Sequence, residues 1–133
     1  MEKITAKCHR VFKDANGIIN VEIIDGVHIA IEQMRETGMV IRSLSEGGMG
    51  LVLVDARPHH TITDEAMAYL KDEMISKNRT ATAVVTDKLG IKLMVDYFAR
   101  LPGINGKIKI CTCKEEGLNW LLSMQSAGRS AAI

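Results

Sequence analysis

The chain has 133 residues, of which 47% are hydrophobic and 25% are charged, so its composition is typical of one globular domain and excludes a disordered chain. The 17 Lys and Arg residues nearly balance the 16 Asp and Glu residues, and the net charge of +1 argues against nucleic acid as a partner. No apolar stretch approaches the roughly 18 residues of a membrane span, and the first residues lack the apolar core of a signal peptide. We therefore expect a cytoplasmic protein.

The first third of the chain predicts two strands followed by a helix. Strands over residues 4–12 and 18–24 flank a turn that ends in Asn16-Gly17, a pair that readily adopts the positive φ of a tight hairpin. Apolar residues then recur every three or four positions and predict a helix over about 30–45. The glycines of Glu46-Gly-Gly-Met-Gly50 follow this helix and precede a strand. Because phosphate loops instead follow a strand and open a helix, this segment is predicted to be a connector.

The remaining sequence alternates between strand and helix signals. Short apolar runs are typical of strands buried on both faces, and they occur at 51–54, 80–86 and 107–112. Helix starts are indicated by a cap at Thr63, a cap at Asp87, and a capping box that pairs Thr112 with Glu115. The helix after Thr63 is expected to end near Lys77-Asn78. The tail over 125–133 is small and polar, and we expect it to fray.

This order, ββαβαβαβα, predicts an α/β fold close to the border with α+β. Strands that alternate with helices form mostly parallel sheets with right-handed crossovers, and the N-terminal hairpin adds an antiparallel strand. We expect one central sheet, about four helices, and a single domain over residues 1–124.

The loop after the strand at 51–54 is the predicted functional rim, because ligands and partners of open α/β sheets collect at the carboxyl ends of the strands. His59 and His60 have the side chains for acid–base catalysis, with Asp55 to orient one of them. However, neighbouring residues on an extended chain point apart, and this pair follows Pro58 in a loop expected to be solvated. We therefore predict a binding rim without catalysis. Its candidate residues are Asp55, Arg57, Thr61, Thr63, Asp64, Glu65 and Lys88.

The cysteines and histidines do not form a recognisable metal site. The three cysteines are an odd number and do not indicate a disulfide framework. Cys8-His9 and His59-His60 lack the spacing of metal ligands, and no nucleotide-binding or nucleophile motif is present. We predict no metal and no cofactor, and we expect most of the eight methionines to fill the core.

Three segments, together with the element order, carry a resemblance to a known family, and they span the chain to about Met124. These segments are Leu51-Val-Leu-Val-Asp55 with Arg57, the helix entry Thr61-Ile-Thr-Asp-Glu-Ala-Met67, and Glu115-Glu-Gly-Leu-Asn-Trp-Leu121. On these residues the chain resembles the STAS domain, and within it the SpoIIAA-like proteins of the STAS/SEC14 group.

The resemblance implies a regulatory domain of the anti-sigma factor antagonist type. In that family a serine at the start of the helix after the central strand is phosphorylated by a partner kinase. This chain places Thr63, Asp64, Glu65 and Ala66 on the four positions of that motif, so the acceptor serine is missing and the fixed negative charge of Asp64 and Glu65 stands where the family has a switchable one. The resemblance therefore implies partner binding without the usual phosphoserine switch. Thr61 and Thr63 are alternative acceptors.

The leading hypothesis is a non-enzymatic regulatory module that binds a protein through this rim. The alternative is a binder of a small lipophilic or anionic ligand in a cavity lined by Met67, Met94 and Phe98, and a third possibility is an enzyme. An exposed apolar patch near residues 61–70 would favour the partner, and an enclosed pocket would favour the ligand. We also expect a homodimer, formed through apolar residues of the first two strands.

Overall fold

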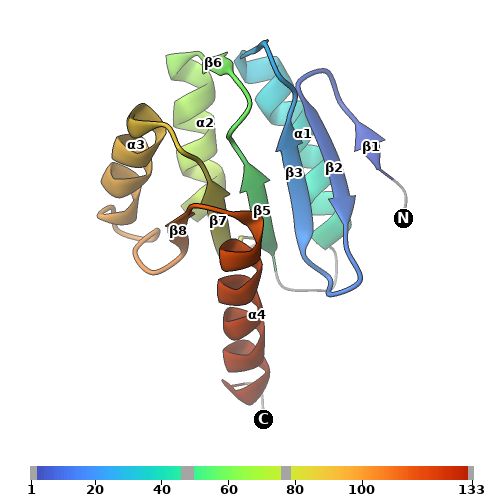
Figure 1. The fold of residues 1–133 in the computed structure, drawn as a ribbon, viewed down its shortest axis with the longest axis vertical. Helices are drawn as coiled ribbons and strands as arrows, with labels where there is room; N and C mark the ends of the chain where they lie inside the picture. Colours follow the sequence, from blue (N-terminus) through green and yellow to red (C-terminus); the bar gives the residue numbers. More distant parts are fainter. Residues whose placement is uncertain (1–2, 46–49, 76–78, 132–133) are drawn as a thin grey trace.

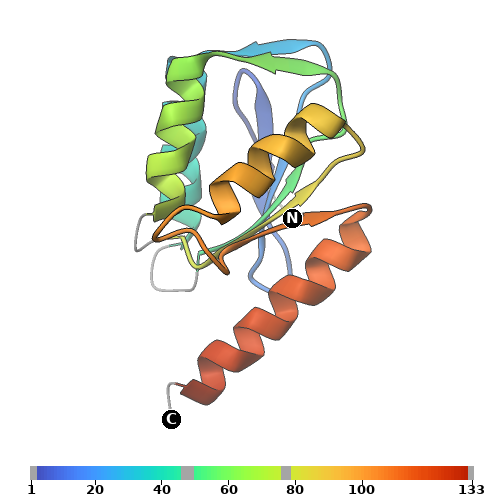
Figure 2. The same ribbon diagram turned by 90° about the vertical axis from the view of Figure 1, so that its left-hand side faces the viewer.

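The computed structural model describes residues 3–45, 50–75 and 79–131, with a central sheet covered by helices on both faces (Figures 1 and 2). The strands of this sheet are β1 (Ile4–Thr5), β2 (His9–Lys13), β3 (Ile19–Ile23), β5 (Leu51–Asp55), β7 (Ala81–Val85) and β8 (Ile108–Cys111). They lie in the order β1-β2-β3-β5-β7-β8. The pairs β1-β2 and β2-β3 are antiparallel, and the pairs β3-β5, β5-β7 and β7-β8 are parallel. The predicted fold class is confirmed.

The helices divide unequally between the two faces of the sheet. They are α1 (Ile31–Ser45), α2 (Asp64–Ile75), α3 (Leu89–Ala99) and α4 (Lys114–Ala131). Figure 2 shows α1, α2 and α3 on one side and α4 on the other. Strand periodicity explains how both faces are apolar: on β5, Leu51 and Leu53 pack toward α4, whereas Val52 and Val54 face the opposite side.

The predicted hairpin is confirmed between β2 and β3. Gly17 adopts a φ of 82°, a conformation that side chains other than glycine rarely reach. The Asp14 carboxylate accepts hydrogen bonds from the N–H groups of Asn16 (2.9 Å) and Ile18 (3.0 Å), and these bonds hold the turn.

Two strand predictions need correction. The single strand expected over 4–12 is two strands, because the chain turns after Thr5 and pairs Ile4 with Val11 in antiparallel register. A second, two-stranded parallel sheet is also present, formed by β4 (Val27–Ile29) and β6 (His60–Ile62). Figure 2 shows this pair running across the top of the molecule toward α1 and α2. Strands of three residues are too short for periodicity to reveal, and His60 and Thr61 were expected to belong to the loop that follows the strand at 51–54.

Two cap predictions are also wrong in detail. The cap residue of α3 is Lys88 instead of Asp87, and it makes no side-chain capping bond. Thr112 pairs with Glu116 instead of Glu115: its N–H (3.1 Å) and hydroxyl (3.0 Å) both donate to the Glu116 carboxylate. The reason is that α4 starts at Lys114, which makes Glu116 the third helical residue.

The last helix extends into the predicted C-terminal tail. The structure describes α4 through Ala131, whereas fraying was expected over 125–133. Residues 46–49 of the predicted connector over 46–50, and the predicted helix end at Lys77-Asn78, lie outside the described residues.

Candidate functional site

A pocket of about 370 Å³ lies between the sheet and the three helices on its α1–α3 face. It exists because α2 packs mainly against α1 and leaves space above β5 and β7. The two helices approach closely at Gly38, where a Cβ would lie 3.1 Å from the Tyr69 hydroxyl oxygen. The pocket therefore lies between the sheet and the helix layer of the fold.

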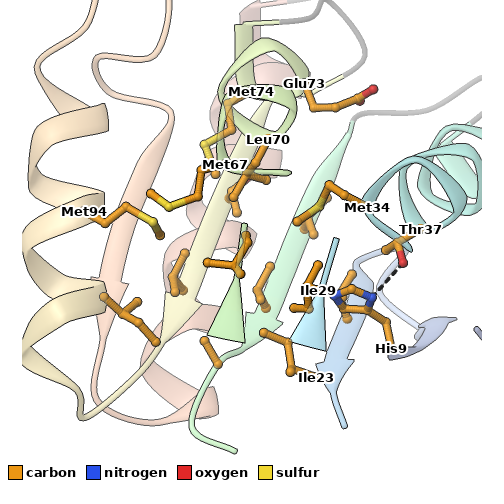
Figure 3. Close-up of a pocket in the computed structure, with 18 of the residues that line it drawn as sticks. His9, Ile23, Ile29, Met34, Thr37, Met67, Leu70, Glu73, Met74 and Met94 are labelled. Atoms are coloured by element: carbon orange, nitrogen blue, oxygen red, sulfur yellow. Dashed lines mark hydrogen bonds between the residues drawn. The ribbon is translucent and has the colours of Figure 1, made fainter. Parts of the chain in front are cut away.

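The pocket wall is almost entirely apolar. Its floor is the α1–α3 face of the sheet, which contributes Val21, Val52, Val54 and Val84. Figure 3 shows the side chains of the helices directed into the space above this floor, with Met67 of α2 and Met94 of α3 close to each other. Flexible thioether side chains adapt readily to the shape of a guest. The helices contribute Met34, Ile41, Met67, Leu70, Met74, Ile91, Met94 and Val95.

One polar group of the pocket is a buried histidine. His9 on β2 is only 3% exposed, and its Nδ1 shares a hydrogen bond of 2.8 Å with the Thr37 hydroxyl of α1 (Figure 3). Burial lowers the pKa of His9 to about 4, and the nearby His60 adds to this shift. The His9 ring is therefore neutral at pH 7 and brings hydrogen-bonding capacity but no charge to the pocket.

A second polar group lies just before β7. Arg79 is 5% exposed, lines the pocket, and donates from Nη1 to the Thr82 hydroxyl at 3.1 Å. Burial lowers the pKa of Arg79 to about 10, so the guanidinium still carries its charge at pH 7. Glu73 of α2 also lines the pocket, and its carboxylate forms an ion pair with Arg42 of α1.

The predicted rim residues do not all lie on the pocket side of the sheet: Asp55 lies near α4, whereas Lys88 lines the pocket. Asp55 and Arg57 form a two-point ion pair, with Nε to Oδ1 and Nη2 to Oδ2 both at 2.9 Å. Lys114 of α4 reaches the Asp55 carboxylate at 3.8 Å and Glu22 at 3.1 Å. Hydrogen bonds from Arg57 hold the pKa of Asp55 below its usual range. Lys88 links the two sides, because it lines the pocket and its Nζ donates to the Arg57 carbonyl.

The remaining rim residues mark the start of α2. The Thr63 hydroxyl accepts the Ala66 N–H at 3.1 Å, as predicted for a helix cap. The Thr61 hydroxyl lies 2.6 Å from Nδ1 of His28. Asp64 and Glu65 are exposed in the first turn of α2, where carboxylates are favoured by the helix dipole.

His59 and His60 each bond a group other than Asp55. The His59 N–H bonds the Asp25 carboxylate at 3.0 Å, and Nδ1 of His60 bonds the Pro58 carbonyl at 2.8 Å. The first contact joins residues 34 positions apart in the sequence and the second joins residues two apart, and neither joins a histidine to Asp55. Within the described residues, no three His, Cys, Asp or Glu side chains are close enough together to hold a metal ion.

The pocket includes residues that sequence reasoning missed. Met67 and Met94 line it as hypothesised, but Phe98 is buried beside it and does not line it. His9, Thr37 and Arg79 were not predicted as site residues. The one available signal was strand parity, since His9 has the same parity on β2 as the buried Val11.

Comparison with known proteins agrees with this architecture. A crystal structure of an uncharacterised protein of the DUF3478 family from Shewanella loihica, described as having a SpoIIAA-like fold, is similar with a TM-score of 0.62. The match covers 89% of this chain and 98% of that protein at 14% sequence identity. The chain therefore has a SpoIIAA-like fold, as the resemblance implied.

The sequence also matches a family model over most of its length. Residues 12–125 match a family model described as a domain of unknown function, DUF7793, and the chain belongs to that family. No curated protein sequence matches the chain. Among the described helices, none combines the length and the apolar character that crossing a membrane requires.

Proposed function

We propose that this chain is a non-enzymatic binding module whose pocket takes up a small, mostly apolar molecule. The observation that carries the proposal is the apolar pocket of about 370 Å³ between the sheet and α1–α3. This volume falls within the roughly 300–1,000 Å³ of small-molecule sites, and such sites combine apolar walls with a few polar groups. It supports the ligand-binding alternative over the rim as the principal functional site.

The volume sets the size of the ligand. At about 30 Å³ for each water-sized group, the pocket holds roughly a dozen non-hydrogen atoms. A ligand of that size that gains about 0.5 kcal/mol per atom binds with a dissociation constant of tens of micromolar. Calorimetry can measure this range directly.

The test uses 1-decanol, an uncharged molecule of matching size, titrated into the protein in an isothermal calorimeter. We expect saturable binding at one site per chain. Met67→Trp places a large ring in the pocket and should abolish binding, whereas Met39→Trp, on the exposed side of α1, should leave it intact. Thermal unfolding of both variants checks that they fold. Absence of binding to the unmodified protein, or binding unaffected by a folded Met67→Trp variant, would contradict the proposal.

A second candidate function is regulation through a protein partner at the rim. Its support is the charge displayed there: Arg57 is held in place by Asp55, and Asp64 and Glu65 are exposed at the start of α2. The Thr61 and Thr63 hydroxyls already have hydrogen-bond partners, which favours fixed charge over phosphorylation as the means of recognition.

Exchange of charge at the rim tests this second candidate. An Arg57→Glu, Glu65→Lys double variant should lose a partner that co-purifies with the chain from its own cells. Lys109→Glu changes an exposed charge on β8, away from the rim, and should retain the partner. Equal retention by both variants would exclude the rim as the contact surface.

We also propose that the chain forms a homodimer, but through a different surface from the first two strands expected from the sequence. Of the exposed large apolar side chains, Leu89, Leu93 and Tyr97 share one face of α3, whereas β1 and β2 contribute Ile4. We therefore place the dimer contact on α3.

A further inference from the structure

Among the described residues that line the pocket, Arg79 is the one that brings a nine-tenths buried positive charge into the apolar cavity. Its side chain lies just before β7, and the one side-chain hydrogen bond that it makes within the described residues goes to Thr82. Thr82 is an uncharged partner. An ionised group removed from water without a counter-charge is strongly disfavoured, so burial of this guanidinium needs compensation.

The neighbouring charges do not supply that compensation in full. Glu73 is the pocket-lining carboxylate, and it already forms an ion pair with Arg42. The three side chains Arg42, Glu73 and Arg79 therefore carry a net charge of +1 at this end of the pocket. An anion that enters the pocket would balance it.

The donors around Arg79 suit an oxyanion. A guanidinium presents a planar set of N–H groups that matches two oxygens of a carboxylate or phosphate. The Thr82 hydroxyl accepts from Arg79, and since its own O–H has no acceptor among the described residues, it can donate to the same anion. The other pocket-lining cation, Lys88, donates its ammonium to the Arg57 carbonyl at the opposite end of β7.

We propose that the natural ligand is an amphiphile with an oxyanion head group, a carboxylate or a phosphate, that pairs with Arg79 and Thr82. Its apolar tail lies among Met67, Leu70 and Met94 (Figure 3). This inference rests on the proposed function, because it names the chemistry of the ligand for the same pocket. His9 at the other side of the pocket is neutral at pH 7 and does not compete for the anion.

The test compares three molecules with the same ten-carbon chain at pH 7.5: 1-decanol, decanoate and decyl phosphate, each below its micellar concentration. We expect at least one of the two anions to bind at least ten times more tightly than the alcohol, and the tighter of the two identifies the head group. Equal affinities for all three would overturn the oxyanion inference and leave the proposed function standing. Failure of all three to bind would overturn the proposed function itself.

Variants assign the preference to Arg79. Arg79→Met should remove the preference for the anion while 1-decanol binds as before, and Lys88→Gln should retain the preference. Replacement of a buried, incompletely paired charge by an apolar side chain is often neutral or stabilising, so we expect Arg79→Met to fold. An anion preference that survives Arg79→Met would overturn the assignment.

A measurement on the unmodified protein keeps the assignment testable if that variant does not fold. Decanoate labelled with ¹³C at its carboxyl group reports its own ionisation by NMR. Beside a guanidinium, the bound carboxyl group should titrate at lower pH than the free molecule. A bound carboxyl group that titrates at the same pH as the free one, or higher, would contradict pairing with Arg79.

Discussion

His9 and Thr37 join the first antiparallel strands to α1 through a buried hydrogen bond of 2.8 Å at the wall of the pocket. The ring must be neutral to remain there, because burial lowers the pKa of His9 to about 4. In the unfolded chain a histidine titrates near 6.5. Between these two values the unfolded state binds more protons than the folded state.

The first prediction is that the protein loses stability in mild acid. Since protons bind preferentially to the unfolded state, the free energy of unfolding should fall as pH drops from about 7 toward 4. From pH 7.5 to pH 5 we expect a loss of about 2 kcal/mol, measured by urea unfolding. His9→Gln should flatten this dependence, whatever its own stability. A profile for His9→Gln as steep as that of the unmodified protein would show that another group is responsible.

The second prediction concerns Gly117, on the face of α4 that packs against the sheet. A Cβ there would lie 2.7 Å from Cδ1 of Leu53 and 3.2 Å from the Cβ of Ala83. Gly117→Ala gains about 1 kcal/mol of helix propensity, but the buried Leu53 side chain or α4 itself must then shift within a close-packed layer. We expect the clash to dominate and the free energy of unfolding to fall by roughly 1–3 kcal/mol in urea.

Gly90 is the matched control for that substitution. It also lies in a helix, near the start of α3, but no atom lies within 4 Å of a Cβ built on it. Gly90→Ala should therefore leave the protein unchanged or stabilise it by up to about 1 kcal/mol. Similar effects at the two positions would mean that α4 is not closely packed at Gly117.

Much of the fold could be predicted because its signals are local. The apolar run at Leu51–Val54 and the pair Asn16-Gly17 each indicate their own structure within a few residues, and both are found as expected. β4 and β6 were missed because each has three residues and gains its stability from pairing with a segment about thirty residues away. Such pairing leaves no periodic trace in either segment.

The pocket could not be predicted in the same way. Its existence depends on how far α2 stands from the sheet, which follows from packing at positions such as Gly38 and Tyr69. The amphipathic pattern of Met67, Leu70 and Met74 indicates a buried face but does not say whether that face meets a strand or a cavity. Arg79 lies in a connection between a helix and a strand, where a polar residue gives no sign of burial.

The third prediction concerns the three thiols, which differ in exposure. Cys113 is exposed, whereas Cys8 and Cys111 are buried, and burial raises the pKa of both buried thiols. Because the thiolate is the reactive form, Cys113 should react rapidly with a disulfide reagent at pH 7.5 while the other two react slowly. Titration should count one fast thiol in the native protein, three in denaturant, and none in native Cys113→Ser. A second fast thiol would contradict the burial of Cys8 or Cys111.

The fourth prediction concerns self-association through α3. Leu89, Leu93 and Tyr97 are 70%, 60% and 53% exposed and follow one another at intervals of four residues, so they form one apolar stripe. When two copies of α3 pack in antiparallel orientation about Leu93, helix geometry places Leu89 of each copy near Tyr97 of the other. In the same arrangement Lys92 of one copy lies within one helical turn of Asp96 of the other, so opposite charges flank the apolar stripe.

Light scattering at about 100 μM should therefore give the mass of a dimer. Leu93→Glu should give the mass of a monomer, because it places two carboxylates at the symmetry axis, and a substitution at so exposed a position should change stability by less than about 0.5 kcal/mol. Ile4→Glu, on β1, is the control and should remain dimeric. If Ile4→Glu dissociates the dimer and Leu93→Glu does not, the contact lies on the first strands. A monomer mass for the unmodified protein at this concentration would exclude both.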